Sequence, residues 1–486
     1  MALARTHCLR YTMSMVDASR EKGVAGGSAP RATLLAIGDM HLGVRPSGVP
    51  DLGSFDQTCL TPATALANAV DLAIEKEVDA VLFAGDLVES ANARFEALRP
   101  LEDAINRLAA ANIRVLAVVG NHDSAALPAL ARTIDGLELI GEGGEWESKT
   151  IEVDGEPAVE IMGWSFPAPH YPASPLASLL EDPLPQRGLP RIGLLHGDLD
   201  GSGEYAPFRR SELEAAGLDG WLLGHIHKPT LGMETMTGGV PFGYLGSLVG
   251  LDGGEPGSHG PWLVSIGQDG GLTCEQSVTA PLRWEEVELE LATDTTSSDL
   301  GDLLMEETKR AAVSLHERGL RPRALGLRIT VVGAVSTGTD LREWIARREN
   351  WKELGRAVEE TEVFIHKISA RLELALGLDK LALENSPAGL LAKDIVALDG
   401  NGERREALLA AARARLGAEV EKARWQEVHK MRNFSDPLTD EALAERLRRA
   451  GTRALTALLA GRELGDGDTG ADSQVTDSRS QAGVSQ

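Results

Sequence analysis

The chain has 486 residues, of which 48 are Lys or Arg and 73 are Asp or Glu, so its formal net charge is −25 at pH 7. Its 43% hydrophobic and 25% charged residues are typical of a globular protein and exclude a wholly disordered or collagen-like chain. The acidic balance argues against tight, non-specific binding to nucleic acid, because phosphate contacts need Lys and Arg. A pair of bound cations can reverse the sign of the charge at one cleft, so charge alone leaves the substrate open.

The sequence also indicates the cellular compartment in which the protein works. Its apolar runs, such as AVLFAG and RVLAVVG, are far shorter than the roughly 18 residues that cross a bilayer. The first thirty residues lack the continuous apolar run of a secretory signal. The cysteines, Cys8, Cys59 and Cys274, lie far apart and form no metal-binding pair. We therefore expect a cytoplasmic protein with no membrane association.

The length predicts about three domains. Residues 1–31 are rich in Ser, Ala, Gly and charge, and we expect a flexible N-terminal extension. From Ala32 the segments ATLLAIGD, AVLFAGD and RVLAVVG read as buried strands. Helical spacing occurs between them in TPATALANAVDLAIEKE and FEALRPLEDAINRLAAAN. This alternation predicts an α/β layer of parallel strands, in which ligands collect beyond the carboxyl ends of the strands.

After about Leu137 the pattern changes to short strands and turns. TIEVDGEPAVEIMGWSF predicts a hairpin around Asp154 and Gly155, and a Pro-rich loop follows it. Further apolar strands read RIGLLHGD, DGWLLGHIH, VPFGYLGS and PWLVSIG. Together these strands predict a second sheet that faces the first.

The remaining chain reads as three parts. Residues 280–338 predict a small α+β domain, with an alternative end near residue 375. Residues 339–464 are rich in Ala, Leu, Glu and Arg with helical spacing, and predict a helical region. Residues 465–486 lack the apolar residues of a core and predict a disordered tail.

Five short motifs follow apolar strands and carry polar donors: GDMH, GD, GNHD, HGD and GHIH. Spacing of the D-x-H type points two donors to the same side of an extended segment. Asp86 is the carboxylate of the GD motif. The seven candidate metal ligands are Asp39, His41, Asp86, Asn121, His196, His225 and His227.

With one shared carboxylate, this set gives two ions four contacts each. Oxygen and imidazole ligands without thiolate favour manganese, iron or zinc over copper or calcium. Two ions about 3.5–4 Å apart can brace the attacking and leaving oxygens of a displacement at phosphorus. The motifs therefore predict hydrolysis of a phosphoester.

The ordered motifs resemble those of the calcineurin-like metallophosphoesterases over roughly residues 33–270. The resemblance implies an α/β class fold, a four-layer α/β/β/α sandwich, over residues 32–279. It implies one ion held by Asp39, His41, Asp86 and His227, and a second ion held by Asp86, Asn121, His196 and His225.

The same resemblance assigns roles to two residues of GNHD. His122 would lie beside the substrate phosphate and assist the leaving group, which suits an imidazole near neutral pH. Asp123 would orient His122.

A narrower resemblance concerns the substrate. The order DMHLG, GDLVES, VVGNHDS, LLHGDLDG, GHIHKP and YLGSLVGLDGGEPGSHGPWLV is similar to that of bacterial DNA repair exonucleases of the SbcD and YhaO type. This chain departs from their pattern at Leu245 and His259, and it has Glu89 where some relatives carry a second catalytic histidine.

The narrower resemblance implies a DNA exonuclease with some endonuclease activity, with two divalent metal ions as cofactors. Manganese is the first expectation, with iron, zinc or magnesium as alternatives. Residues 280–338 would be a capping domain that restricts DNA access. The partner would be an SbcC-like coiled-coil ATPase, docked on the helices of residues 339–464 unless these form an ordinary bundle. A homodimer is also implied.

Other interpretations stay open at this point. The chain could be a phosphodiesterase for small nucleotides or lipid-linked phosphates, or a non-catalytic scaffold. His170 could approach the substrate, and four arginines near the motifs could contact phosphates or be solvated surface residues. These arginines are Arg45, Arg94, Arg209 and Arg210.

Overall fold

The structure is a computed structural model that describes residues 29–89, 96–181, 188–233, 235–336, 338–375, 377–420 and 438–466. The predicted N-terminal extension and C-terminal tail lie outside the described residues, apart from residues 29–31 and 465–466. Among the described residues, no helix combines the length and apolarity that a membrane crossing requires.

The chain divides into two compact units. The first runs to Arg371, apart from the short segments 292–295 and 333–338. Those segments and the chain from Leu372 onward form the second unit.

The first sheet has six strands in the order β11-β10-β1-β2-β3-β4. Its strands are β1 (Ala32–Ile37), β2 (Ala80–Ala84), β3 (Arg114–Val118), β4 (Leu137–Leu139), β10 (Trp262–Ile266) and β11 (Leu272–Gln276). Strands β1 to β4 are parallel, as the alternation of strands and helices predicts. Strand β10 pairs antiparallel with β1, so the prediction that PWLVSIG joins the second sheet was wrong. An apolar strand suits either sheet, because both bury similar side chains.

The second sheet has five strands in the order β5-β6-β7-β8-β9. Its strands are β5 (Glu147–Val153), β6 (Glu156–Trp164), β7 (Arg191–His196), β8 (Gly220–Gly224) and β9 (Phe242–Tyr244). Strands β5 and β6 form the predicted hairpin, with Asp154 at φ 55° and Gly155 at φ 81°. Strands β6 to β9 run parallel, so their carboxyl ends lie at one edge of the sheet.

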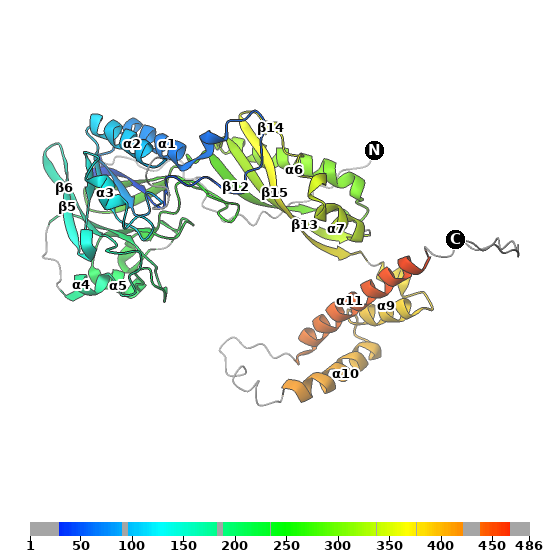
Figure 1. The fold of residues 1–486 in the computed structure, drawn as a ribbon. Helices are drawn as coiled ribbons and strands as arrows, with labels where there is room; N and C mark the ends of the chain where they lie inside the picture. Colours follow the sequence, from blue (N-terminus) through cyan, green and yellow to red (C-terminus); the bar gives the residue numbers. More distant parts are fainter. Residues whose placement is uncertain are drawn as a thin grey trace, which may run out of the picture. The chain divides into compact units, whose positions relative to one another are not determined.

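The two sheets pack face to face between layers of helices (Figure 1). Successive residues of one strand, such as Leu34 and Leu35, are buried in different clusters, so both faces of the sheet are covered. Helices α1 (Pro62–Glu75), α2 (Leu98–Ala110) and α3 (Leu127–Ala131) supply residues to the outer cluster of the first sheet. Helices α4 (Leu176–Glu181) and α5 (Arg210–Ala216) do the same for the second sheet. The predicted α/β/β/α sandwich is confirmed.

A third sheet follows, with strand order β12-β13-β15-β14, and all of it except the last residues of β13 and β15 belongs to the first unit; we call it the capping sheet. Its elements are β12 (Leu282–Glu290), α6 (Ser297–Glu317), β13 (Ala324–Val335), α7 (Gly338–Ala346), β14 (Ala357–Val358) and β15 (Thr361–Leu374). Helix α6 connects the parallel strands β12 and β13, and Thr296 forms a capping box with Asp299 at its start.

The prediction of a helical region from residue 339 does not hold for residues 357–374, which form β14 and β15 and fit the alternative end of the α+β domain near residue 375. The start of β15 reads TEVFI, which is rich in β-branched and aromatic residues that suit a half-buried strand. Pairing within the capping sheet therefore overrides the helical composition of the neighbouring sequence.

The second unit contains four described helices: α8 (Leu378–Leu381), α9 (Pro387–Ala397), α10 (Glu403–Val420) and α11 (Asp440–Asp466). Ile395 of α9 and Leu455 of α11 are buried together. Leu409 of α10 and Leu443 of α11 are buried in a second small cluster. These helices lie within residues 339–464, whose spacing predicts helix, except that α11 continues two residues further to Asp466.

Candidate metal centre

All seven predicted donors lie close together in the structure. Each follows the carboxyl end of β1, β2, β3 or β8, or is itself the last residue of β7. Contacts between side chains or rings connect them across nearly two hundred residues of sequence. Parallel strands gather their carboxyl ends at one edge of a sheet, and the packing of two sheets brings two such edges together.

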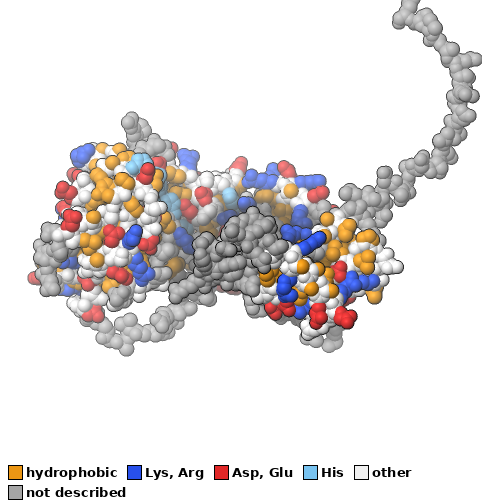
Figure 2. All heavy atoms as spheres, turned by 90° about the horizontal axis from the view of Figure 1, so that it is seen from below, with side chains coloured by type: hydrophobic (Ala, Val, Ile, Leu, Met, Phe, Trp, Pro, Cys, Tyr) orange, Lys and Arg blue, Asp and Glu red, His pale blue; other side chains and the backbone are white. Residues whose placement is uncertain are grey.

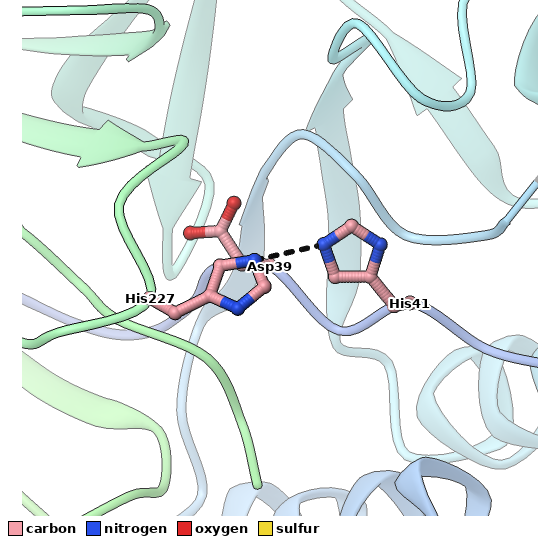
Figure 3. Close-up of side chains that lie close together, drawn as sticks. All are labelled: Asp39, His41 and His227. Carbon is pink, nitrogen blue, oxygen red and sulfur yellow. Dashed lines mark hydrogen bonds between the residues drawn. The ribbon is translucent and has the colours of Figure 1, made fainter. Parts of the chain in front are cut away.

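The first group of donors is Asp39, His41 and His227 (Figure 3). The Nε2 atoms of His41 and His227 lie 3.1 Å apart, so two imidazoles face one another. The Asp39 Oδ1 atom accepts the backbone N–H of His225 at 2.8 Å. The Asp39 Oδ2 atom is buried and has no hydrogen-bond partner among the described residues. A buried carboxylate oxygen without a partner is costly, so this group fits a bound cation.

The second group is Asp39, Asp86 and His196. The Asp86 Oδ2 atom lies 3.3 Å from His196 Nε2 and 3.8 Å from His41 Nε2, so it faces donors of both groups. The Asn121 Oδ1 atom lies 3.0 Å from His196 Nε2. His196 Nδ1 lies 2.9 Å from the carbonyl oxygen of Ala84, which can only accept, so Nδ1 carries the proton and Nε2 faces the site.

The electrostatics of the centre favour a positive charge. Burial raises the pKa of the Asp39 carboxyl, and both Asp39 and Asp86 are almost completely inaccessible. Burial alone would lower the pKa of His196, but Asp86 and Asp39 raise it to about 9. Burial, together with the charge of His196, lowers the pKa of His225 to about 4. A neutral His225 beside buried carboxylates suits a metal ligand.

The backbone at the donors is strained. Asp39, His41, Asp86 and His225 have φ values of 40°, 48°, 52° and 108°, a region that residues other than Gly adopt at a cost. Gly120 permits the close approach of two motifs, because a Cβ there would lie 2.2 Å from Asp86 Oδ1. The fold therefore holds these donors in fixed positions.

His122 lies at the mouth of the centre with its side chain 47% exposed. Its Nδ1 atom is 3.1 Å from Glu89 Oε2, which is also 3.5 Å from His41 Nδ1. A hydrogen bond from His41 lowers the pKa of Glu89, and the charge of His122 lowers it as well. Burial acts in the opposite direction but is outweighed. Glu89 is therefore a carboxylate that contacts both a predicted ligand and the predicted proton donor.

Asp123 has a different role from the predicted one. Its Oδ1 and Oδ2 atoms accept the backbone N–H groups of Gly120 and Leu87 at 2.8 and 2.7 Å. Burial and the nearby charge of Asp86 raise the pKa of Asp123 to about 7. The prediction that Asp123 orients His122 is corrected: Asp123 fastens the GNHD turn to the GD turn, and Glu89 is the carboxylate beside Nδ1 of His122.

Glu255 is a residue of the centre that the motifs did not reveal. Its Oε1 atom lies 2.6 Å from His227 Nδ1, and its Oε2 atom accepts the backbone N–H of Leu251 at 2.9 Å. Glu255 opposes the effect of burial and raises the pKa of His227. No spacing rule connects Glu255 to GHIH, and the only signal was an acidic residue in the glycine-rich segment GGEPG.

The departures from the family pattern are structural. Leu245 is buried in the core between the two sheets. His259 is buried, and both its ring nitrogens have hydrogen-bond partners, Ser247 and the carbonyl oxygen of Glu255. His259 therefore links Ser247 to the backbone of Glu255.

The more distant candidates lie outside the donor cluster. The exposed His170 ring lies 5.6 Å from the Tyr205 ring, which lies 5.5 Å from the His225 ring. Arg45 pairs with Glu96 at 3.8 Å and is largely exposed. Arg209 lies at the N-cap of α5, where its backbone N–H donates to Glu212. The side chain of Arg210 donates to the carbonyl oxygen of Thr235. Arg94 lies outside the described residues.

Comparison with known proteins agrees with this geometry. The calcineurin-like phosphoesterase family matches residues 32–229. The uncharacterized metallophosphoesterase YhaO of Bacillus subtilis (strain 168) is 26% identical over 284 residues, which cover 53% of this chain and 63% of that protein. The match therefore spans less than two thirds of the relative's length.

Two solved structures resemble the chain at low TM-scores. A dimetal phosphatase from Danio rerio has a TM-score of 0.33 and 14% identity, and the match covers 51% of this chain and 99% of that one. The protein TT1561 of Thermus thermophilus has a TM-score of 0.30 and 15% identity, with 50% and 98% covered.

Proposed function

We propose that this chain, whose residues 32–229 match the calcineurin-like phosphoesterases, is a metal-dependent nuclease that hydrolyses phosphodiester bonds in DNA. The observation that carries the proposal is the convergence of the seven donors: five of them form two groups that share Asp39, Asp86 faces His41 and His196, and Asn121 and His225 lie beside His196. Family and geometry together support metal-dependent hydrolysis of a phosphoester. The choice of DNA rests on the order of the motifs and on the capping sheet that follows them.

The donors divide between two divalent cations. Asp39, His41 and His227 would hold one cation, and Asn121, His196 and His225 the other, with Asp86 shared between them. When bound, the two cations supply an activated water and positive charge at the phosphate. We expect manganese, with iron, zinc or magnesium as alternatives, because the donors combine carboxylate, amide and imidazole without thiolate.

His122 supplies the proton to the leaving oxygen. Its exposed position at the mouth of the centre places it where a phosphate substrate would enter. Glu89 lies at Nδ1 of His122 and accepts its N–H, which leaves Nε2–H of the protonated ring as the proton donor for the leaving alkoxide. The backbone N–H of His122 donates to Asp86 Oδ1 at 2.9 Å, which fixes its position against the shared carboxylate.

The acidic composition does not conflict with a DNA substrate. On the face drawn in Figure 2, basic side chains are interspersed with acidic ones, and histidines reach the surface. Two bound cations would add positive charge where the phosphate binds. The proposal includes exonuclease activity with some endonuclease activity, an SbcC-like ATPase docked on the helices of the second unit, and a homodimer.

The test is degradation of linear double-stranded DNA by the purified chain with manganese. We expect degradation by the parent protein and none by Asp86→Ala. Equal activity of the two proteins would contradict the proposal.

A phosphodiesterase for small nucleotides or lipid-linked phosphates is the second candidate. All seven donors lie between residues 39 and 227, within the part that precedes the capping sheet, so hydrolysis of a small diester would not need the cap. Efficient cleavage of cyclic nucleotides beside inert DNA would favour this candidate.

A further inference from the structure

The segment of residues 246–259 lies between β9, which ends at Tyr244, and β10, which starts at Trp262, and it carries Glu255. It is rich in glycine, with Gly250, Gly253, Gly254 and Gly257 around Glu255. Glycine retains the most backbone freedom in an unfolded or loose segment, so this segment needs external anchors to hold one conformation. We call it the Glu255 segment.

One side of the Glu255 segment meets the metal centre. Glu255 Oε1 lies 2.6 Å from Nδ1 of His227, and Ser247 donates to Glu255 Oε2 at 3.1 Å. The backbone N–H of Ser247 donates to the carbonyl oxygen of His227 at 2.9 Å. The position of Glu255 thus decides how the His227 ring is oriented and which of its nitrogens carries the proton.

The other side of the Glu255 segment meets the capping sheet. The buried Trp284 of β12 donates from Nε1 to the carbonyl oxygen of Gly250 at 3.1 Å, and its backbone carbonyl oxygen accepts the N–H of Gly257 at 2.8 Å. Arg328 of β13 donates to the carbonyl oxygen of Gly253 at 2.9 Å. A Cβ at Gly250 would lie 2.8 Å from Trp284 Cδ1, so the indole packs directly against this backbone. Three backbone anchors from the capping sheet therefore bracket Glu255.

We propose that Trp284 and Arg328 of the capping sheet are positioning residues for the metal ligand His227, and that they act through Glu255. They hold the glycine-rich backbone so that the Glu255 carboxylate meets His227 in a single geometry. The capping sheet, which supplies none of the seven predicted donors, thereby sets the affinity of the metal site that includes His227. This inference rests on the proposed function, since it requires that His227 binds a metal ion.

The test compares two variants with matched controls. Trp284→Phe removes the indole N–H but keeps an aromatic ring, and Arg328→Gln removes the guanidinium that contacts Gly253. Trp351→Phe is the first control, because Trp351 is also buried in the first unit and donates to the carbonyl oxygen of Ile345 at 2.8 Å. Arg371→Gln is the second, because Arg371 pairs with Glu288 across the capping sheet as Arg328 pairs with Glu286.

Binding of MnCl2 to the metal-free full-length chain is measured by isothermal titration calorimetry. We expect Trp284→Phe and Arg328→Gln each to weaken one of the two manganese sites by about tenfold, the lower end of the range for residues that support a metal ligand. Both controls should bind manganese as the parent does. Parent-like binding by Trp284→Phe and Arg328→Gln would overturn the inference.

A double-mutant cycle with Glu255→Gln tests whether Trp284 acts on the metal site through Glu255. If Trp284 acts through Glu255, Trp284→Phe should change manganese affinity less than about twofold when Glu255 is already Gln, because coupled residues are not additive. A full tenfold effect of Trp284→Phe in that background would overturn the proposed route.

The experiment also separates this inference from the proposed function. A parent chain that binds no manganese would refute the proposed function itself. A parent that binds two ions while the cap variants bind them equally well would refute only the role of the capping sheet. Thermal unfolding of the metal-free proteins checks the fold, and the side chain of Arg328 is 32% exposed, so Arg328→Gln carries the test if Trp284→Phe does not fold.

Discussion

The two halves of the metal centre are held in different ways. Around Asp86 and His196 the support is buried backbone: the carbonyl oxygen of Ala84 fixes the ring, and the side chains of both residues are at most 3% exposed. Around His41 and His227 the support is carboxylate: Glu89 and Glu255 contact the outer ring nitrogens, and the His227 side chain is 28% exposed. The inner half depends on the strand ends of the sandwich, whereas the outer half depends on side chains from loops.

This difference predicts how substitutions in each half should change metal binding and proton transfer. Loss of Asp86 in the inner half should remove both ions, because this carboxylate is shared between them and lies in a closed space where water cannot replace it. Changes in the outer half should weaken one ion or slow proton transfer while the rest of the centre stays intact.

The largest effect is expected for the shared carboxylate. Asp86→Asn should abolish manganese binding at both sites and lower the rate of diester hydrolysis by more than about a thousandfold, a fraction of the acceleration typical of enzymes. Metal analysis and initial rates measure the two effects. Asp79→Asn is a matched control, since Asp79 lies before β2 and accepts the backbone N–H of Thr33 at 2.8 Å. Retention of both ions by Asp86→Asn would contradict the shared role.

His122→Ala should lower kcat by about a hundredfold or more while both manganese ions remain bound, because only the proton donor is lost. The loss should be much smaller for a substrate with a p-nitrophenolate leaving group, which needs no proton. Loss of metal from this variant would place His122 among the ligands instead.

Glu255→Gln should weaken one manganese site by about ten- to a hundredfold, as expected for removal of the carboxylate that supports a ligating histidine. Calorimetric titration of the metal-free chain with MnCl2 measures this loss of manganese affinity. An equal weakening of both sites would show that the outer half is not independent of the inner half.

The smallest effect is expected for Glu89→Gln, which keeps the shape of the side chain but removes the charge beside His122. We expect kcat to fall by about tenfold with both ions retained, which is less than the loss of about a hundredfold or more expected when the proton donor itself is removed. Glu96→Gln is the control, since Glu96 is an exposed acid that pairs with Arg45. Unchanged kcat in Glu89→Gln would remove Glu89 from the proposed mechanism.

The same contrast explains how much could be predicted from the sequence. The inner donors follow buried strands in short motifs, so local spacing located Asp86 and His196 and indicated the sandwich around them. Glu255 lies 28 residues beyond His227 in the chain, and only the tertiary contact reveals it. The family resemblance identified His122 but assigned its partner to the adjacent Asp123, because neither a motif nor sequence proximity can show that Asp123 accepts backbone N–H groups.

The pairing of β10 and β15 could not be predicted from the sequence for a related reason. The apolar strand β10 could have joined either sheet, and β15 lies in a stretch whose overall composition favours helix. In both cases the outcome depends on which edge of a sheet is free in the folded chain, which is a property of the whole topology.

Anomalous diffraction from crystals of the full chain grown with manganese tests the two-ion centre most directly. We predict two manganese peaks about 3.5–4 Å apart with the Asp86 carboxylate between them, one beside His41 and His227 and the other beside His196 and His225. A single peak, or peaks away from Asp86, would contradict the shared dinuclear centre on which the proposed hydrolysis depends.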